Sequence, residues 1–257
     1  MVMKIFKSKI PSLKTISVAF TLLFAITSVS AQSEIDVDPF EKVIISPHIE
    51  VTFVEGAKEM VEVHSNTQPL SKLNIEVVGK TLRIYLDGAK TYTESKDVEG
   101  DNYDYKVPIY NGTVVKATVT YKNLEELSLR GEEKFICKST IDQNEFTLKI
   151  FGESQVYFNE VKLGDLSTTI YGESFLELKE GSIDSQKITA YGETKVNTLN
   201  VNCNKAKITA YGEGSYRLSV KDRLKVTAFG EATIAYEGSP EVKKGLVIGE
   251  ATIQKMN

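Results

Sequence analysis

The side chains best suited to chemistry recur at a fixed interval in the second half of the sequence. A Gly-Glu pair appears seven times, with gaps of 18 to 21 residues, at Gly131, Gly152, Gly172, Gly192, Gly212, Gly230 and Gly249. If the repeats stack, their glutamates form a file of carboxylates, and carboxylate oxygens are ligands that Ca²⁺ takes. We therefore consider Glu173, Glu193 and Glu213 as candidate Ca²⁺ ligands. The simpler interpretation is that these side chains extend separately into solvent, and the Ca²⁺-binding nonapeptide repeat is absent.

A second set of candidate residues precedes the same glycines. An aromatic residue comes directly before five of them, and Thr and Lys recur two and four positions before that aromatic residue in several repeats. The candidate binding residues are Phe151, Tyr171, Tyr191, Tyr211, Phe229, Thr169, Thr189, Thr209, Lys187 and Lys207. Exposed aromatic faces with hydroxyl and ammonium groups beside them can hold a glycan or a protein. The alternative is that stacked rings only stabilise a sheet.

Catalytic groups are scarce by comparison. His48 and His64 are the only histidines, so a Ser-His-Asp triad or a His-rich metal site has little material. No pair of acidic residues recurs at a spacing that suggests a general acid and a general base. Parallel β-helices do host polysaccharide-active enzymes, but that is an analogy of fold only. We predict no catalytic residues and no enzyme activity.

The residues that flank each Gly-Glu pair indicate which secondary structure carries the candidate binding side chains. Before Gly212, small or apolar Ala206, Ile208 and Ala210 alternate with Lys207, Thr209 and Tyr211. Alternation with period two indicates a β-strand, and a repeat of about 20 residues indicates a solenoid. We predict an all-β chain, a right-handed parallel β-helix with coils of about 20 residues and less regular N-terminal coils. Each coil turns at the same corner, which is why each needs the same glycine.

This register also places the two cysteines, Cys137 and Cys203. Both fall in inward-facing columns, three coils apart, or roughly 14 Å at the strand spacing of a sheet. A disulfide needs Cα atoms within about 7 Å. Although an exported protein could join them, we predict two separate buried thiols.

The N-terminus has the pattern of a secretory signal peptide over residues 1–31. Four lysines precede a short apolar run, and small residues follow as a cleavage site after Ala31. The apolar run is short for a membrane span, and no cysteine follows that would carry a lipid anchor. Removing this segment takes the formal net charge from −4 to −8, because four lysines and no acids leave. An acidic mature chain argues against nucleic-acid binding.

We expect residues 32–257 to form a single β-helix domain. Residues 32–130 would be irregular N-terminal coils, with a hairpin around Gly79-Lys80 and a polar segment over 88–112 that forms a protruding loop or an irregular hairpin. Residues 131–257 would be the regular Gly-Glu coils. With no cap visible after the last coil, either the N-terminal strands cover that end or two chains meet end to end as a homo-oligomer.

The order of these segments resembles a known family. "ISPHIEVTFVEGAKEMVEVHSN" is followed by "LNIEVVGKTLRIYLDG", by "LEELSLRGEEKF" and then by glycine-anchored coils. This is similar to the auto-transporter adhesin head, or GIN, domains of exported Bacteroidetes proteins, over about 40–255. The family usually carries Gly-Ser-Gly-like corners where this chain has Gly-Glu, which implies the same fold with a different surface. The resemblance implies no catalytic residues.

Together these features predict an exported, non-enzymatic, adhesin-like protein that binds a glycan or a surface protein on its Tyr/Thr/Lys face. The alternative is a structural cell-envelope protein without a small ligand, and a polysaccharide-active enzyme is the less favoured third interpretation. No cofactor is predicted beyond the Ca²⁺ hypothesis. The signal peptide predicts the periplasm, the outer cell envelope or the medium as its location, without a transmembrane segment in the mature chain.

Overall fold

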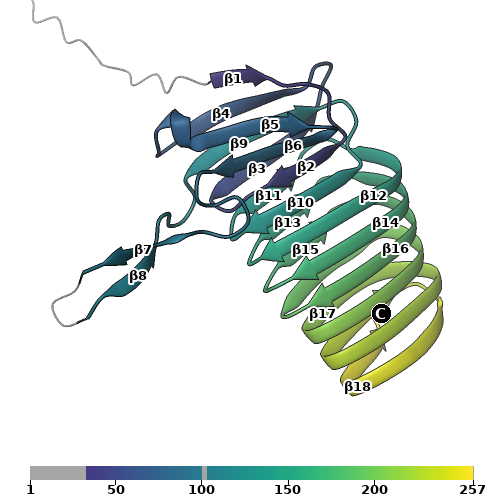
Figure 1. Cartoon of the computed structure of the whole chain (residues 1–257). Coiled ribbons are helices and arrows are strands. Elements are labelled where there is room, and N and C mark those ends of the chain that lie inside the picture. Colours follow the sequence, from purple (N-terminus) through teal and green to yellow (C-terminus); the bar gives the residue numbers. More distant parts are fainter. Residues whose placement is uncertain (1–32, 100–102, 257) are drawn as a thin grey trace, which may run out of the picture. The chain divides into compact units, whose positions relative to one another are not determined.

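The computed structural model describes residues 33–99 and 103–256. Within them the chain consists almost entirely of β-strands, which stack in parallel coils (Figure 1). Residues 20 apart pair in successive coils, as Val161 does with Gly181. This confirms the predicted all-β parallel solenoid. The predicted signal peptide, 1–31, lies outside the described residues.

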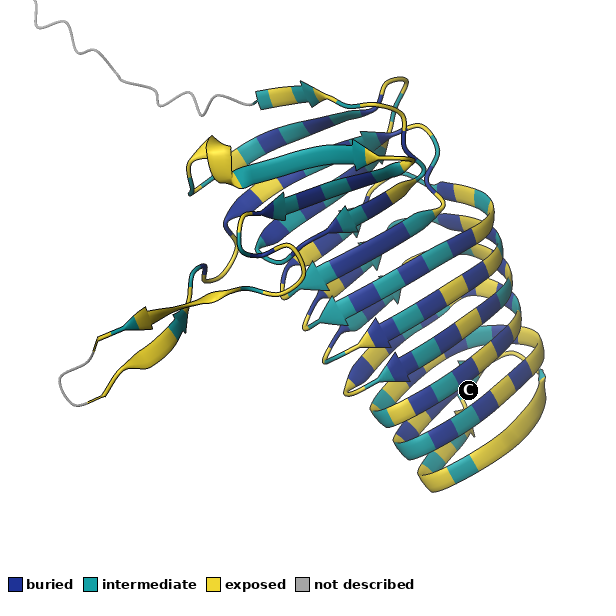
Figure 2. Ribbon diagram, in the orientation of Figure 1, coloured by how far each residue is buried: buried dark blue, intermediate teal, exposed yellow. Residues whose placement is uncertain are grey.

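The walls of the regular coils are strands, each of which pairs in parallel with the equivalent strand of the next coil. The pairing of one coil with the next skips Asn144 and Gly164, which marks a second corner in addition to the Gly-Glu corner. The strands that end at a Gly-Glu corner or run through one are β10 (Glu126–Gly131), β12 (Ile141–Gly152), β14 (Val161–Tyr171), β16 (Gly181–Tyr191), β17 (Thr194–Glu237) and β18 (Glu241–Lys255). The short strands after the Gly-Glu corner are β11 (Lys134–Cys137), β13 (Gln155–Phe158) and β15 (Phe175–Leu178). Along the strands of the regular coils before β18, buried residues alternate with more exposed ones (Figure 2).

The N-terminal coils continue the stack and then close it. Their parallel strands are β2 (Lys42–Ile45), β3 (Ile49–Glu55), β6 (Thr81–Leu86) and β9 (Val115–Tyr121). Antiparallel strands then end both ladders: β1 (Ser33–Asp36), β4 (Met60–Asn66) and β5 (Leu73–Val78), with one 3₁₀ turn, η1 (Leu70–Lys72). The less regular coils and the hairpin at Gly79-Lys80 agree with the sequence. The antiparallel pairing of β5 with β6 is that hairpin, whereas the antiparallel pairing of β4 with β9 and of β1 with β4 was not predicted. Together these strands cover edges that would otherwise be open.

The predicted polar loop over 88–112 contains a hairpin arm. Its strands β7 (Ser95–Val98) and β8 (Tyr105–Pro108) pair only with each other, as a separate two-stranded sheet (Figure 1). Tyr103 and Tyr105 meet edge to face on it, with ring centroids 6.3 Å apart. The arm therefore extends from the coils instead of joining their walls.

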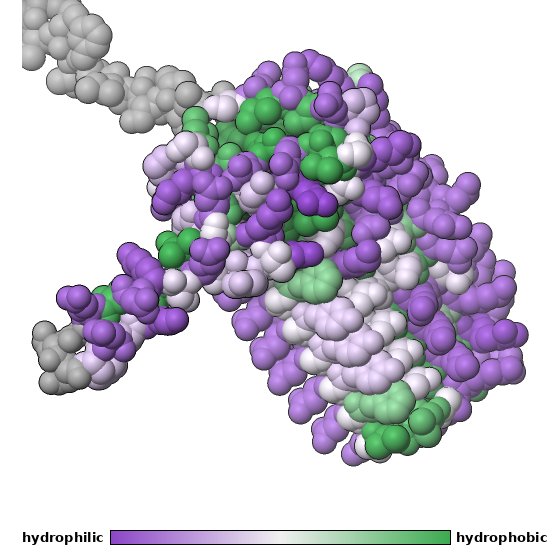
Figure 3. Space-filling view, viewed as in Figure 1, coloured by the Kyte–Doolittle hydropathy of each residue, from purple (hydrophilic) through white to green (hydrophobic). Residues whose placement is uncertain are grey.

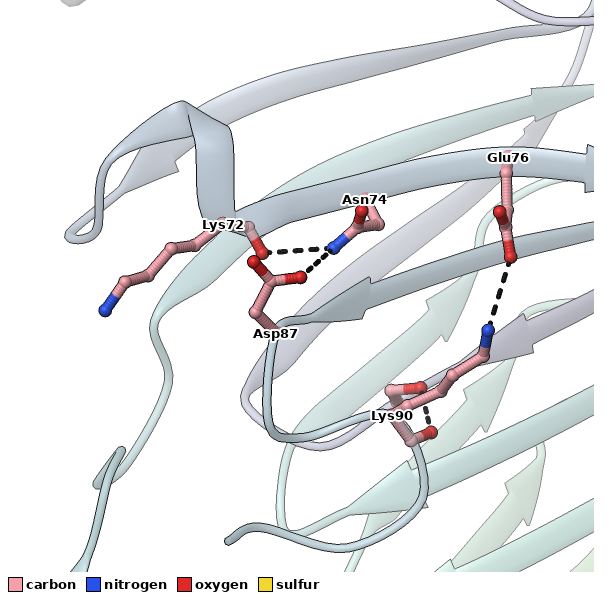
Figure 4. Close-up of polar contacts among 6 residues, drawn as sticks. Lys72, Asn74, Glu76, Asp87 and Lys90 are labelled. Atoms are coloured by element: carbon pink, nitrogen blue, oxygen red, sulfur yellow. Dashed lines mark hydrogen bonds and ion pairs between the residues drawn. The ribbon is translucent and has the colours of Figure 1, made fainter. Parts of the chain in front are cut away.

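The chain that enters this arm is fastened to the N-terminal coils (Figure 4). The Asn74 side chain donates to the Asp87 carboxylate at 2.7 Å, and the Lys90 ammonium lies 3.5 Å from Glu76. The hydroxyl of Ser46 also donates to the backbone carbonyl of Lys90, at 2.7 Å. These contacts, from β5 and from the residue that follows β2, fix the backbone just before the arm begins.

Glycine is required at the Gly-Glu corners for both a conformational and a steric reason. Their φ angles lie between 103° and 127°, a region that L-residues rarely adopt. A Cβ on Gly172 would also lie 2.3 Å from the carbonyl oxygen of Gly152 in the preceding coil. Successive corners therefore approach so closely that no side chain fits between them.

The two cysteines are free and buried, as predicted from the register. Burial raises the pKa of Cys137 to about 12 and that of Cys203 to about 11. Each thiol donates weakly to a backbone carbonyl two residues later in the chain. They are packing residues of the solenoid interior.

The C-terminal coil is far more exposed than the others. Strand β18 pairs with β17, and Leu246 and Ile248 are 60% and 59% exposed. The N-terminal strands close the opposite end of the stack, so they do not cover this coil. End-to-end association stays a prediction. Among the described residues, no helix has the length and apolar character needed to cross a membrane.

Candidate binding site: an aromatic ladder and a pocket in the first coil

The aromatic residues before the corner glycines form one column on the outside of the solenoid. Tyr171 pairs with Phe151 on one side and with Tyr191 on the other, and Tyr191 pairs with Tyr211. Because the register does not shift, each ring lies directly above the ring of the preceding coil. In the space-filling view this face carries a continuous column of pale, flat side chains (Figure 3). We call the column from Phe151 to Phe229 the aromatic ladder.

The rings of the aromatic ladder are stacked nearly parallel to one another. From Tyr171 to Phe229 the centroids of neighbouring rings are 4.5, 4.7 and 4.8 Å apart, with angles of 3° to 4° between the planes. Phe151 lies 5.4 Å from Tyr171. These distances match the spacing of strands in a sheet, so the backbone dictates the stacking. Each interior ring is covered on both faces, and the ladder offers ring edges and phenol hydroxyls to solvent.

This geometry corrects one expectation from the sequence. Open aromatic faces are not available on the interior rungs, because neighbouring rings occupy them. Tyr171 and Tyr211 are nevertheless 43% and 37% exposed, which leaves their edges accessible. Burial against its neighbours raises the pKa of Tyr191 above its ordinary value of 10.0, and the phenols of Tyr171 and Tyr211 add to the increase. Like that of any tyrosine near its ordinary pKa, the Tyr191 hydroxyl is protonated at neutral pH and can donate a hydrogen bond.

The other predicted columns lie beside the aromatic ladder in the same register. Thr169 pairs with Thr189 and Thr189 with Thr209, while Lys187 pairs with Lys207. The threonines are half-buried and the lysines are exposed. The structure thus brings all ten predicted residues onto one face, where hydroxyls and ammonium groups repeat at the strand spacing. That this face binds a ligand stays a prediction.

The predicted Ca²⁺ ligands lie at the corner next to this face. Glu173, Glu193 and Glu213 are all exposed. Within 33–99 and 103–256, no three His, Cys, Asp or Glu side chains are placed together so that they could hold a metal ion. The three glutamates therefore do not form a clustered cation site in this part of the chain.

A pocket at the N-terminal end of the aromatic ladder was not predicted from the sequence. It has a volume of about 350 Å³ and is lined by 47–48, 91–93, Gly112, 130–133 and 151–153. These segments come from the turn after β2, both ends of the arm, and the first two Gly-Glu corners. The pocket therefore exists only once the arm and the first coils have come together.

Arg130 forms the boundary between the pocket and the aromatic ladder. It pairs with Phe151 in the sheet, so it occupies the position that an aromatic residue fills in the next five coils. Its guanidinium lies 5.4 Å from the centre of the Phe151 ring, a cation–π contact that ends the stack. Its Nε is buried and has no hydrogen-bond partner in the described part of the chain.

Glu133 is the buried acid of the pocket, with only 5% of the residue exposed. Its carboxylate accepts a hydrogen bond from the backbone N–H of Glu132 at 3.0 Å. Burial raises the pKa of this carboxyl above its ordinary value of 4.5, against the opposing effects of His48 and nearby backbone N–H groups. In the next two coils the same position is a serine, Ser154 and Ser174, that donates to a corner glycine carbonyl.

His48 holds the arm against the first corner. Its two ring nitrogens lie 2.7 Å from the carbonyl oxygen of Gly112 and 2.7 Å from the hydroxyl of Thr93, so it bridges both ends of the arm. Its φ angle is +71°, and it is the only non-glycine residue with positive φ among the described residues. Such strain persists only where surrounding contacts enforce it, and it is common at binding sites.

A signal for the pocket was present in the repeat itself. Aligned coil by coil, the sequence has two departures in the first coil, Arg130 in the aromatic column and Glu133 in the small-residue column. Nothing in the sequence indicated that His48 and Thr93 would line this pocket, because neither residue belongs to the regular repeat.

Comparison with solved structures supports the fold. Putative adhesins from Bacteroides fragilis and Parabacteroides merdae align with TM-scores of 0.72 and 0.63, at 17% and 20% sequence identity. A protein from Parabacteroides distasonis described as a putative lipid binding protein aligns with a TM-score of 0.60 at 20% identity. In each case the alignment covers 88% of this chain and 96% of the other. At these identities the likeness shows the fold alone.

The comparison of sequences is more specific. Among curated proteins, no sequence matches significantly. Residues 39–240, which include the N-terminal coils, the arm and all of the aromatic ladder, match the family described as putative auto-transporter adhesin, head GIN domain. The chain belongs to this family.

Proposed function

We propose that this protein is an exported, non-enzymatic adhesin that binds a glycan along its aromatic ladder. The observation that carries the proposal is the exposed row of phenol hydroxyls, which repeats at the ring spacing of 4.5 to 4.7 Å between Tyr171, Tyr191 and Tyr211. The name of the family and the predicted signal peptide support a location in the periplasm, the outer envelope or the medium.

The chemistry of the face favours a polyhydroxylated ligand. Phenol and threonine hydroxyls both donate and accept hydrogen bonds, and lysine ammonium groups donate three. Sugar hydroxyls can meet all of these groups, whereas an apolar surface would leave them unpaired. Because the rows are spaced like strands, the face suits an extended chain that runs across the coils.

A structural role in the envelope is the second candidate. The parallel stack itself favours it, because aromatic pairs stabilise a fold by about 0.5–1.5 kcal/mol each beyond their buried area. In that case the ladder would reinforce the long wall of the solenoid and would bind nothing.

The test is glycan-array binding of the purified chain beside two variants. Tyr171→Phe/Tyr191→Phe/Tyr211→Phe removes three hydroxyls and keeps every ring, so the stack and the fold should survive. Tyr157→Phe is the matched control, since Tyr157 is half-buried on a different wall and its hydroxyl donates to Gln155.

Binding that the triple variant loses and the control retains would support the proposal. Binding that is equal in all three proteins would exclude the phenol hydroxyls as the contact. If the wild-type chain binds no glycan, with or without Ca²⁺, the structural role becomes the better account.

A further inference from the structure

The first Gly-Glu coil departs from the repeat at two positions, and both departures line the same pocket. Arg130 stands in the column of aromatic residues, and Glu133 stands where the following coils carry Ser154, Ser174 and then Thr194. A guanidinium and a buried carboxylate thus occur together at the first Gly-Glu corner, where residues of the arm line the same pocket. Neither residue is required by the solenoid, because the later coils form without them.

The pocket is held in shape before any ligand arrives. His48 joins both ends of the arm through Gly112 and Thr93, at 2.7 Å each. Just before the arm, the carbonyl of Lys90 accepts a hydrogen bond from Ser46. A preorganised cavity loses less conformational entropy on binding than a flexible one.

The polar groups of the pocket exclude some ligands and favour others. Three acidic residues, Glu132, Glu133 and Glu153, line it beside one arginine, so an anion would meet excess negative charge. The described residues contain no group of three metal ligands, which gives a metal ion little to bind. Arg130 supplies N–H donors and Glu133 supplies an acceptor. A neutral ring with neighbouring hydroxyls matches both, because each hydroxyl can donate to the carboxylate and accept from the guanidinium.

The size and surroundings agree with a single sugar ring. A volume of about 350 Å³ is at the small end of the range for ligand pockets. Tyr92, 74% exposed, lines the pocket from the arm side, and Phe151 lines it from the ladder side. Phe151 is also the first ring of the aromatic ladder, so the pocket and the ladder are continuous.

We propose that this pocket is a terminal subsite that binds one neutral pyranose, the end residue of a glycan whose following residues lie along the aromatic ladder. The inference rests on the proposed glycan-binding function, and it specifies which end of the ladder selects the ligand. It also gives the arm a role in binding, because the root of the arm, 91–93, lines one side of the subsite.

Two variants test the subsite by restoring the repeat. Arg130→Phe installs the residue of the next coil and should extend the ring stack, while Glu133→Ser installs the residue found in the next two coils. Both should therefore fold, which thermal melts would verify. Saturation-transfer NMR with glucose, galactose, mannose and N-acetylglucosamine would measure monosaccharide binding, with glucuronate as the anionic comparison.

We expect the wild-type chain to bind at least one neutral monosaccharide and each variant to bind it at least about tenfold more weakly, as for the loss of hydrogen bonds to charged groups. Wild-type failure to bind any of the four sugars, unchanged affinity in the variants, or a preference for glucuronate would each overturn the proposal.

The triple variant Tyr171→Phe/Tyr191→Phe/Tyr211→Phe separates this inference from the proposed function on which it rests. It should keep the monosaccharide affinity and lose the extra affinity for a neutral hexasaccharide of the bound sugar. If Arg130→Phe and Glu133→Ser abolish monosaccharide binding but the triple variant binds the hexasaccharide normally, the subsite stands and the ladder proposal fails. If only the triple variant loses hexasaccharide binding, the ladder stands and the subsite is wrong.

Discussion

The corner glycines give the sharpest test of the fold, through a graded series of glycine-to-alanine substitutions. Gly79, in the hairpin between β5 and β6, has a φ of +62°, and nothing lies within 4 Å of the position that a Cβ would take. Gly192 and Gly172, at corners, have φ of +106° and +111°, and their Cβ atoms would lie 2.9 and 2.3 Å from the carbonyl oxygen of the preceding corner. The three sites thus separate backbone strain from collision.

The expected magnitudes follow from these two terms. Gly79→Ala carries only the left-handed strain of an L-residue, about 1–2 kcal/mol. Gly172→Ala carries the larger strain of a conformation that is essentially restricted to glycine, about 1–3 kcal/mol, and must also displace the backbone of the adjoining coil. We expect Gly172→Ala to cost at least about 3 kcal/mol, which is a large part of the roughly 5–15 kcal/mol typical of a folded protein. Gly192→Ala should fall between the other two.

Equilibrium urea unfolding, followed by far-ultraviolet circular dichroism, measures these free energies. Equal m-values across the series would show that the variants differ in stability alone. A Gly172→Ala variant that unfolds within about 1 kcal/mol of Gly79→Ala would refute the argument that stacked corners exclude a side chain.

Three further predictions concern the aromatic ladder, the pocket and the thiols. A double-mutant cycle of Tyr171→Ala with Tyr191→Ala should give a coupling free energy of about 0.5–1.5 kcal/mol, and additive effects would mean that the stack is not stabilising. Because the pKa of Glu133 is raised in the folded state, its protonation stabilises the fold at low pH, and this contribution is lost as the pH rises from 4.5 through the folded-state pKa. The melting temperature of Glu133→Gln relative to wild type should therefore rise as the pH increases from 4.5 toward neutrality, and a constant difference would contradict the shift. Cys137 and Cys203, buried and with raised pKa values, should react with an aromatic disulfide reagent at mildly alkaline pH only after unfolding, and fast labelling of the native chain would exclude their burial.

The regular coils could be predicted from the sequence because their information is local and repeated. The alternation around Gly192 and Gly212 defines which residues face inward, and the 20-residue period defines which residues stack. In a solenoid each coil contacts mainly its neighbours, so these two periods are sufficient to set the register. The same reasoning located the columns of candidate binding residues and the separate, buried cysteines.

The closure of the N-terminal end depended on contacts that no period encodes. Strand β4 pairs antiparallel with β9, which follows much later in the chain, and β1 pairs antiparallel with β4. Alternating patterns are the same in parallel and antiparallel strands, because side chains alternate between faces in both. Pairing direction therefore required the tertiary structure.

The accessible chemistry of the aromatic ladder was also decided in three dimensions. The sequence placed Tyr171, Tyr191 and Tyr211 in one outward column, but only the ring geometry shows that their faces are covered and that their edges and hydroxyls are exposed. Strand spacing forces rings this close together into a parallel stack, so the ladder presents hydrogen-bonding groups instead of flat apolar faces.

The pocket shows most clearly which features could be predicted from the sequence and which depended on the tertiary structure. The residue types of Arg130 and Glu133 were readable as departures from the repeat, because each belongs to a column with a known rule. Their meeting with His48 and Thr93 was not readable, because those residues lie 82 and 37 positions before Arg130 in segments without periodicity. The repeat determined what each coil exposes, and the folding of the irregular arm over the first coil determined where those groups enclose a cavity.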